Sequence, residues 1–346
     1  MADPSNNPPA PPPIPPSDPS AKYKQMPVFI SAINELNTNA DQLQKRQKLL
    51  IQIEDMLTAR FGSPNKVMSY VVRFSHSRSG MSSNDIPSFE TVLNSVTSAE
   101  QINLIMHSPG GDGTIVEKMV DMCRSHLSGK NRQFRVIVPN IAKSAATVLT
   151  LGADKVLMGY CSELGPIDPQ VPIVVSGVTQ WISAFAFVDS RDNLMEQIAE
   201  ATKKGKPTTG LLQQLAGLNI PFTNEMENVI GFSRKTAAKL LDKYMLLSKF
   251  PQAAKRKKKA KEIAGKLLSK QLFPVHGQFI DGGTAQQLGL EIDVLDKGDK
   301  LWELIWEYYI RSELQMNIAL SPGMVKVKLF ESSAQGASLV VQELPN

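Results

Sequence analysis

Short apolar strands alternate with amphipathic helices between Lys66 and Asp168, and this alternation constrains the fold more than any other feature. Residues 67–74 and 102–106 have the composition of buried strands, and residues 86–96 between them have the apolar spacing of a helix. The same order continues along the chain as helix 115–127, strand 134–138, helix 145–151 and strand 155–158. Strands that alternate with helices predict an α/β fold with a parallel sheet and right-handed crossovers.

The rest of the chain divides around this block. The βα pattern returns late, as a helix at 283–288 that Gly289 ends and a strand at 290–295. A helix is predicted over 28–60, and segments 324–330 and 338–342 alternate like a weak hairpin. We expect six regions: a disordered proline-rich tail 1–20, an N-terminal helical arm 21–65, an α/β core 66–189, an inserted helical subdomain 190–271, the end of the core 272–316 and a C-terminal extension 317–346.

Composition excludes several classes of protein. The 346 residues include only two cysteines, Cys123 and Cys161, which is too few for a disulfide framework and predicts a reducing, cytoplasmic compartment. With four scattered histidines, the chain predicts no metal site and no cofactor. Residues 1–20 hold nine prolines and no lysine or arginine, so no signal peptide is expected. The longest charge-free stretch, 169–188, is too polar and too broken for a membrane span.

The net charge of +5 is local. Six lysine and arginine residues lie within 255–261, and the chain without them carries a net charge of −1. Because the helix predicted there continues through Ile263, Leu267 and Leu268, the basic side chains are expected to face water. Nucleic acid is therefore not expected as a partner, whereas an acidic protein partner stays open for this run, as any partner does for the proline-rich tail.

Two segments combine a strand end with a helix start, where chemistry is often found. In Met106–Gly113, the pair Gly110 and Gly111 can turn sharply and expose amides that suit a phosphate or an oxyanion. In Asn140–Thr147, Ser144 precedes a helix whose first turn has only small residues. Ser144 can be a nucleophile near the positive helix end or an ordinary N-cap. A third segment, Phe273–Asp281, contains His276, which can be a general base or a structural histidine.

Taken together, these segments resemble the Clp peptidase and signal peptide peptidase superfamily, and within it the serine dehydrogenase proteinase family. The signs are strand–Ser-Pro-Gly-Gly–helix, strand–Lys-Ser-Ala-Ala–helix, Ala-Asp-Lys-Val-Leu-Met and Gly-Pro-Ile-Asp-Pro-Gln, followed by the late His276. The resemblance covers about residues 42–295 and is most specific over 102–170. It implies a crotonase-like superhelix of ββα units, with an added N-terminal helix and an inserted helical subdomain, that assembles into a homo-oligomer.

The resemblance also implies roles for individual residues. Ser144 is then the nucleophile of a serine endopeptidase, His276 its base, and the amides of Gly110 or Gly111 and of Ala145 its oxyanion hole. The acid that orients the base is either Asp168 or Asp85, and Asp168 can also be a simple turn residue before a proline. The base can instead be a lysine, as in signal peptide peptidases; the sequence offers Lys203, Lys204 and Lys206.

The expected function is hydrolysis of peptides or unfolded proteins without a cofactor. Two other functions stay open at this point. The chain can be a non-catalytic scaffold subunit of the same fold, or a crotonase-type acyl-CoA enzyme that uses the same paired amides on a thioester. The sequence leaves the ring size, the peptide specificity and the involvement of an ATPase undetermined, because fold alone does not fix function.

Overall fold

The computed structural model describes residues 30–33, 42–96, 99–316, 324–334 and 338–344. The chain divides into two units, 1–40 and 41–346. Residues 30–33 of the first unit are helical, and the predicted proline-rich tail lies outside the described residues. Everything that follows concerns the second unit, whose first element is the helix α3 (Gln42–Phe61). The helix predicted over 28–60 therefore corresponds to α3 in its second part, and residues 34–41 lie outside the description.

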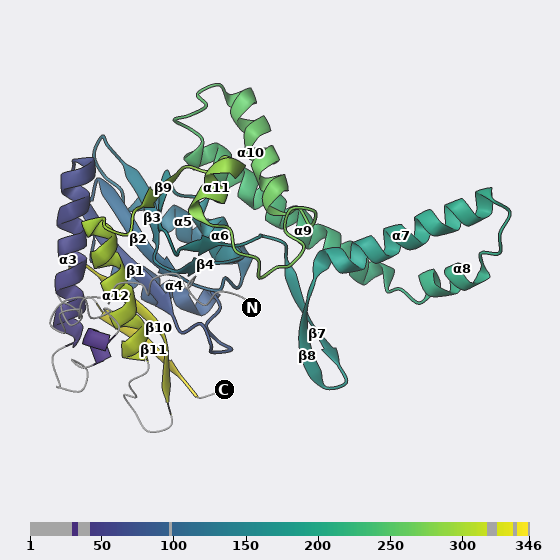
Figure 1. The fold of residues 1–346 in the computed structure, drawn as a ribbon, viewed down its shortest axis with the longest axis horizontal. Coiled ribbons are helices and arrows are strands. Elements are labelled where there is room, and N and C mark those ends of the chain that lie inside the picture. The colour runs from purple at the N-terminus through teal and green to yellow at the C-terminus, as the bar shows by residue number, and fades with distance from the viewer. Residues whose placement is uncertain (1–29, 34–41, 97–98, 317–323, 335–337, 345–346) are drawn as a thin grey trace, which may run out of the picture. The chain divides into compact units, whose positions relative to one another are not determined.

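Seven of the described strands form the main sheet. They are β1 (Asn65–Val72), β2 (Gln101–His107), β3 (Gln133–Val138), β5 (Lys155–Gly159), β9 (Ile292–Leu295), β10 (Val325–Ser332) and β11 (Ser338–Glu343). Their order is β11–β10–β1–β2–β3–β5–β9 (Figure 1). The pairs from β1 to β9 are parallel, as the alternation of strands and helices predicts, whereas β10 pairs antiparallel with β1.

Helices cover both faces of this sheet because alternate residues of each buried strand point in opposite directions. Met68, Tyr70 and Val72 of β1 enter one core with α4 (Ile86–Asn94) and α5 (Val116–Ser125). Ser69, between them, hydrogen-bonds Tyr308 of α12 (Lys300–Met316) on the other face. The helices α3 and α12 pack on each other and on β1 (Figure 1).

Two smaller sheets follow the main one along the chain. The strands β4 (Ile141–Ala142) and β6 (Glu163–Leu164) pair in parallel beside α6 (Ala145–Thr150). The strands β7 (Gln170–Val175) and β8 (Val178–Ser183) form a hairpin (Figure 1).

The helical segment that contains the predicted insertion, 190–271, takes part in two cores. It contains α7 (Ala184–Lys203), α8 (Thr209–Ala216), α9 (Ile220–Leu240), a π-helical turn (Leu241–Met245) and α10 (Ala253–Leu267). Met226 and Ile230 of α9 pack with Ala184 in a small cluster. Ala237 and Leu240, further along α9, belong to the main core together with the apolar side of α10. The helix α9 therefore contributes buried side chains to both clusters.

The C-terminal segment contributes more to the fold than its weak pattern indicates. Its hairpin is present as β10 and β11, but β10 also extends the main sheet by pairing with β1 over Met68–Val72. The helix α11 (Gly282–Leu288) ends at Gly289, whose φ of +106° is left-handed, as predicted. None of the helices within the described ranges has the length and apolar character that a membrane span requires.

Candidate functional site

The turn after β2 accepts only glycine at two positions. Gly110 has a φ of +102° and Gly111 a φ of +138°, both in the left-handed region. A Cβ on Gly110 would lie 2.7 Å from the carbonyl oxygen of Lys143, and one on Gly111 would lie 2.3 Å from the amide nitrogen of Met81. The glycine turn therefore lies between the segment that leads into Ser144 and the segment around Met81.

Ser144 begins α6 in a strained backbone conformation. Its φ of +49° and ψ of −120° are rare for a residue with a side chain. Among the described residues its hydroxyl makes no capping hydrogen bond, although an N-cap was one interpretation of the sequence. Neighbouring contacts fix the turn instead: Lys143 N donates to Ser108 O at 3.0 Å and Thr147 Oγ1 donates to Ala142 O at 2.6 Å. The strain keeps the Ser144 hydroxyl out of the helix cap.

The backbone amides near Ser144 differ in their availability. Gly110 N donates to Ser108 Oγ at 3.1 Å. Gly111 forms an isolated parallel bridge with Met81, in which Met81 N donates to Gly110 O at 2.7 Å. In such a bridge the amide of Gly111 points away from Met81. Ala145 is the first residue of α6, and a helix leaves its first amides without an internal partner. Gly111 and Ala145 thus offer better oxyanion donors than Gly110.

His276 and Asp168 form a hydrogen-bonded pair. His276 Nδ1 lies 2.7 Å from Asp168 Oδ1. The tautomer that carries its proton on Nδ1 donates to the carboxylate and leaves Nε2 as an acceptor. The side chain of His276 is 27% exposed, whereas that of Asp168 is 1% exposed. The imidazole is therefore accessible while the carboxylate that holds it is enclosed.

Several donors keep the Asp168 carboxylate charged. Its Oδ2 accepts hydrogen bonds from Gln170 Nε2 at 2.8 Å, Ser183 Oγ at 2.9 Å and Lys270 Nζ at 2.9 Å. Burial on its own raises the pKa of Asp168, but the hydrogen bonds from His276, Lys270 and Ser183 outweigh burial and bring that pKa below its ordinary value. Asp168 is consequently ionised at neutral pH and is more than a turn residue.

The other sequence candidates lie in different surroundings. Asp85 is buried against Lys328, whose Nζ lies 2.7 Å from its Oδ1. Lys203 is the last residue of α7, and Lys204 and Lys206 follow it; all three are exposed, and none lines the pocket that contains Ser144. In this structure His276 thus has Asp168, and not Asp85, as its carboxylate partner.

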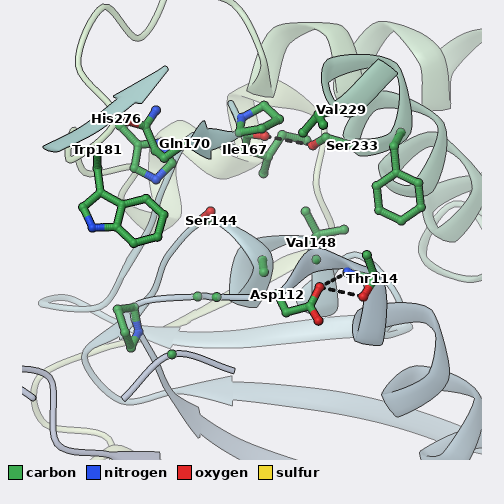
Figure 2. Close-up of a pocket in the computed structure, with 18 of the residues that line it drawn as sticks. Asp112, Thr114, Ser144, Val148, Ile167, Gln170, Trp181, Val229, Ser233 and His276 are labelled. Carbon is green, nitrogen blue, oxygen red and sulfur yellow. Dashed lines mark hydrogen bonds between the residues drawn. The ribbon is translucent and has the colours of Figure 1, made fainter. Parts of the chain in front are cut away.

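A pocket of about 850 Å³ brings the predicted segments together. Ser144, Gly110 and Gly111 line it on one side and His276 on the other. In Figure 2 the Ser144 oxygen points toward the side where His276, Gln170 and Trp181 lie. In the described part of the chain, no hydrogen bond joins Ser144 Oγ to His276. Such contacts are often long in proteins without substrate and tighten when substrate binds.

Apolar residues that complete this pocket gave no signal in the sequence. Val229 of α9, Val148, Ile167 and Trp181 give the pocket apolar surface (Figure 2), and Phe232 of α9 adds to it. Each of these side chains is unremarkable in its own segment. Only the packing of α9 against the core brings them to the site, so no local sequence signal could have identified them.

Lys143 is another residue whose contacts the sequence did not reveal. Its Nζ donates to Glu163 Oε2 at 2.9 Å and to the carbonyl oxygen of Gln278 at 3.4 Å. Gln278 lies two residues after His276 in the same loop. Lys143 therefore ties the turn of Ser144 to the loop of His276.

Within the described ranges, no group of three or more histidine, cysteine, aspartate or glutamate residues could hold a metal ion. The free cysteines also lie outside the pocket lining. Burial raises the pKa of the thiols of Cys123 and Cys161, which disfavours their reactive thiolate forms. The geometry therefore directs attention to Ser144 and to the His276–Asp168 pair, of which Ser144 and His276 line the pocket and Asp168 lies behind His276.

Comparison with known proteins relates one part of the chain to a family of serine proteinases. Residues 83–184 match the family of ClpP-like SDH-type serine proteinases. This segment contains the glycine turn, Ser144 and Asp168, and ends before His276. Over residues 83–184, the match confirms the resemblance to the serine dehydrogenase proteinase family that the sequence motifs indicated.

Two similar proteins come from Methanocaldococcus jannaschii, and both are titled uncharacterized. MJ0137 is 29% identical over 157 residues, which cover 41% of this chain and 52% of that protein. MJ1495 is 33% identical over 70 residues, which cover 20% of this chain and 23% of that protein. The chain thus spans about half the length of the first relative. A mutant of the 1510-N membrane-bound stomatin-specific protease shows a TM-score of 0.25 at 16% identity, over 38% of this chain and 63% of that one, which is too weak a likeness to inform the fold.

Proposed function

We propose that this chain is a serine peptidase in which Ser144 is the nucleophile, His276 the general base and Asp168 the acid that orients the base. The family match supports a serine peptidase at the level of the family. The observation that carries the finer assignment is the 2.7 Å hydrogen bond between His276 and the buried Asp168, in a pocket that Ser144 also lines. A nucleophile and a base that line one pocket, with a buried acid that orients the base, are the parts that acyl transfer needs.

In the proposed reaction, Ser144 Oγ attacks the carbonyl carbon of a peptide bond. His276 Nε2 takes the hydroxyl proton, while Nδ1–H donates to Asp168 and stabilises the imidazolium that forms. The same Nε2–H then protonates the leaving amine, so that an acyl-enzyme forms on Ser144. Water, activated by His276, hydrolyses the ester and returns the proton to Ser144.

The negative charge that develops on the substrate oxygen needs donors that are already in place. We assign this role to the amides of Gly111 and Ala145, because Gly110 N is engaged by Ser108 Oγ. Ala145 stands at the N-terminus of α6, where the helix dipole also favours a negative charge. Each donor of this kind contributes about 3–4 kcal/mol to transition-state stabilisation in well-formed sites.

The apolar wall of Val148, Val229 and Phe232 suits the side chain of an unfolded peptide. We therefore propose peptides or unfolded proteins as substrates, in the cytoplasm and in a homo-oligomer. Support for an oligomer comes from the β7–β8 hairpin, where Val174 and Trp181 are 72% and 67% exposed. Light scattering at micromolar concentration tests this part, and a monomeric mass would contradict it.

A scaffold subunit of the same fold is the second candidate. The observation that favours it is that no hydrogen bond joins Ser144 to His276 among the described residues. Covalent labelling separates the two functions, because an activated serine reacts with a fluorophosphonate and a scaffold does not. The wild type should be labelled at Ser144 and should hydrolyse fluorescein-labelled casein.

The control variants for this experiment are Ser144→Ala and Ser190→Ala. Ser190 is an exposed residue of α7 whose hydroxyl only bonds the carbonyl oxygen of Ala186. We expect Ser144→Ala to lose both labelling and hydrolysis and Ser190→Ala to keep both. Casein hydrolysis by purified Ser144→Ala would refute the assignment of the nucleophile, and an unlabelled, inactive wild type would favour the scaffold.

A further inference from the structure

The second buried carboxylate, Asp85, and its partner Lys328 have no part in the chemistry proposed above. Both side chains are almost fully enclosed, at 3% and 5% exposure. Lys328 Nζ donates to Asp85 Oδ1 at 2.7 Å and to Oδ2 at 2.8 Å. Asp85 Oδ2 also accepts from Ser82 N at 2.8 Å and from Tyr70 Oη at 3.0 Å. Because an unpaired buried charge is costly, these contacts hold Lys328 and the segment before Asp85 in one arrangement.

Lys328 makes one further contact, which leads toward the pocket. Its Nζ donates to the carbonyl oxygen of Gly80 at 2.6 Å. Gly80 itself lines the pocket of Ser144. A lysine ammonium has three protons, and the carbonyl of Gly80 and the two oxygens of Asp85 use all of them.

The next residue, Met81, is joined to the glycine turn by backbone hydrogen bonds. Met81 N donates to Gly110 O at 2.7 Å, and Asp112 N donates to Met81 O at 2.8 Å. Met81 is thus hydrogen-bonded to the residue before Gly111 and to the residue after it. Gly111 also has no room to shift toward Met81, because even a Cβ there would lie 2.3 Å from the Met81 nitrogen.

We propose that Asp85 and Lys328 are a positioning pair, which fixes the Gly80–Met81 segment and through it the Gly111 amide that receives the oxyanion. This inference rests on the proposed function, since it needs Gly111 to act on the reacting carbonyl. The pair acts through the backbone and does not touch the substrate. Lys328 belongs to β10, so the C-terminal hairpin becomes part of the catalytic apparatus although it lies outside the family match at 83–184.

The experiment replaces the pair as a unit. Asp85→Asn/Lys328→Met removes both charges at nearly constant volume, so that neither charge is left buried alone. The matched control is Arg46→Met/Glu331→Gln, which removes another buried ion pair that also involves β10, with side-chain exposures of 2% and 1%. Arg46 also hydrogen-bonds the carbonyl oxygen of Gln42, and Glu331 accepts from Tyr308 and Ser338, none of which belongs to the glycine turn. Both variants are assayed with p-nitrophenyl butyrate, well below their melting temperatures.

The expected result is a split between kcat and KM. In Asp85→Asn/Lys328→Met, kcat falls by about 10- to 100-fold while KM stays within about twofold, because a misplaced amide affects the transition state more than the bound ester. The control variant loses thermal stability but keeps kcat. A wild-type kcat in Asp85→Asn/Lys328→Met would overturn the inference. A kcat that falls equally in this variant and in the control would overturn it as well.

A second variant keeps the inference testable if the double variant does not fold. Asp85→Asn alone is nearly isosteric and weakens only the anchor of Lys328. We expect the amide protons of Met81 and Asp112 to exchange faster with solvent than in the wild type, relative to Ile105 in β2, and kcat to fall at constant KM. Unchanged exchange at both amides with unchanged kcat would overturn the inference. An inactive wild type that a fluorophosphonate does not label would instead overturn the proposed function.

Discussion

Two buried aspartates, Asp168 and Asp85, have closely similar partners and different surroundings. Each carboxylate is paired with a lysine, Lys270 or Lys328, and each accepts a hydrogen bond from a hydroxyl group. Lys270 is 26% exposed, whereas Lys328 is 5% exposed. Asp168 also holds His276, which reaches the pocket, while every side chain that we find on Asp85 is buried. A carboxylate with an accessible histidine can assist proton transfer, and one with only buried partners can position the backbone.

A comparison of Lys143 with Lys328 extends this contrast to the backbone near the site. Lys143 connects the Ser144 turn to the His276 loop through Gln278 O, on the side of Asp168. Lys328 connects β10 to Gly80 O, on the side of Asp85. Each lysine donates to a backbone carbonyl next to a group of the proposed mechanism. Substitutions on the side of Asp168 should therefore affect proton transfer, and substitutions on the side of Asp85 should affect only the position of the backbone.

The largest effect is expected for the nucleophile and base. Ser144→Ala and His276→Ala should each lower kcat for p-nitrophenyl butyrate by about 10⁴- to 10⁶-fold, and the double variant should be no worse, since members of one catalytic unit are not additive. Single and double variants are compared by steady-state kinetics. Near-normal activity of His276→Ala, combined with inactivity of a Lys203, Lys204 or Lys206 variant, would replace the histidine base by a lysine.

The next effect separates the two aspartates directly. Asp168→Asn should lower kcat by about 10⁴-fold, because an amide can no longer select the histidine tautomer that leaves Nε2 free. Asp85→Asn should lower kcat by about tenfold or less, since it disturbs only the position of an amide. The measurement is kcat against pH for both variants. A larger loss in Asp85→Asn than in Asp168→Asn would reverse the assignment of the orienting acid.

A moderate effect is expected at Lys143. Lys143→Met keeps the stem that packs on Gly165 but removes the bonds to Glu163 and the His276 loop. We expect kcat to fall by about tenfold at nearly constant KM, because the base is less well placed over Ser144. Lys239→Met, which breaks an exposed ion pair with Glu117, is the control and should leave kcat unchanged. An equal loss in both variants would contradict the role of Lys143.

Much of the fold could be predicted because its pattern is local. The periodicity of 67–74, 86–96 and 102–106 was sufficient for the parallel order of β1, α4 and β2, and Gly289 correctly marked the end of α11. The pairing of β10 with β1 could not be predicted, because more than 200 residues separate the two strands in the sequence. The wall from α9 was missed for the same reason.

The candidate site shows the same division. Ser144 and the glycine pair were found because strand–turn–helix junctions have a recognisable local pattern. The sequence could not decide whether Asp85 or Asp168 orients the base, because both aspartates lie just before a helix or strand. Only the tertiary contact between Asp168 and His276 distinguishes them. The bonds of Lys143 and Lys328 to distant carbonyls could not be predicted, although Lys143 belongs to the Lys-Ser-Ala-Ala motif, because the sequence does not show which carbonyl a lysine reaches.

The smallest expected effect is the acid stability that Asp168 confers. Its pKa is lowered in the folded protein, because the hydrogen bonds from His276, Lys270 and Ser183 outweigh burial. A carboxyl whose pKa is lower in the folded than in the unfolded state stabilises the fold above the unfolded value and loses this contribution as the pH falls through the folded value. The wild type should therefore lose a few degrees of melting temperature between about pH 5 and pH 2 that Asp168→Asn does not lose. Melting curves of both proteins, followed by circular dichroism over this range, measure the difference. Parallel curves would mean that the three donors do not favour the ionised carboxylate, and the contrast with a purely positioning aspartate would then have no electrostatic basis.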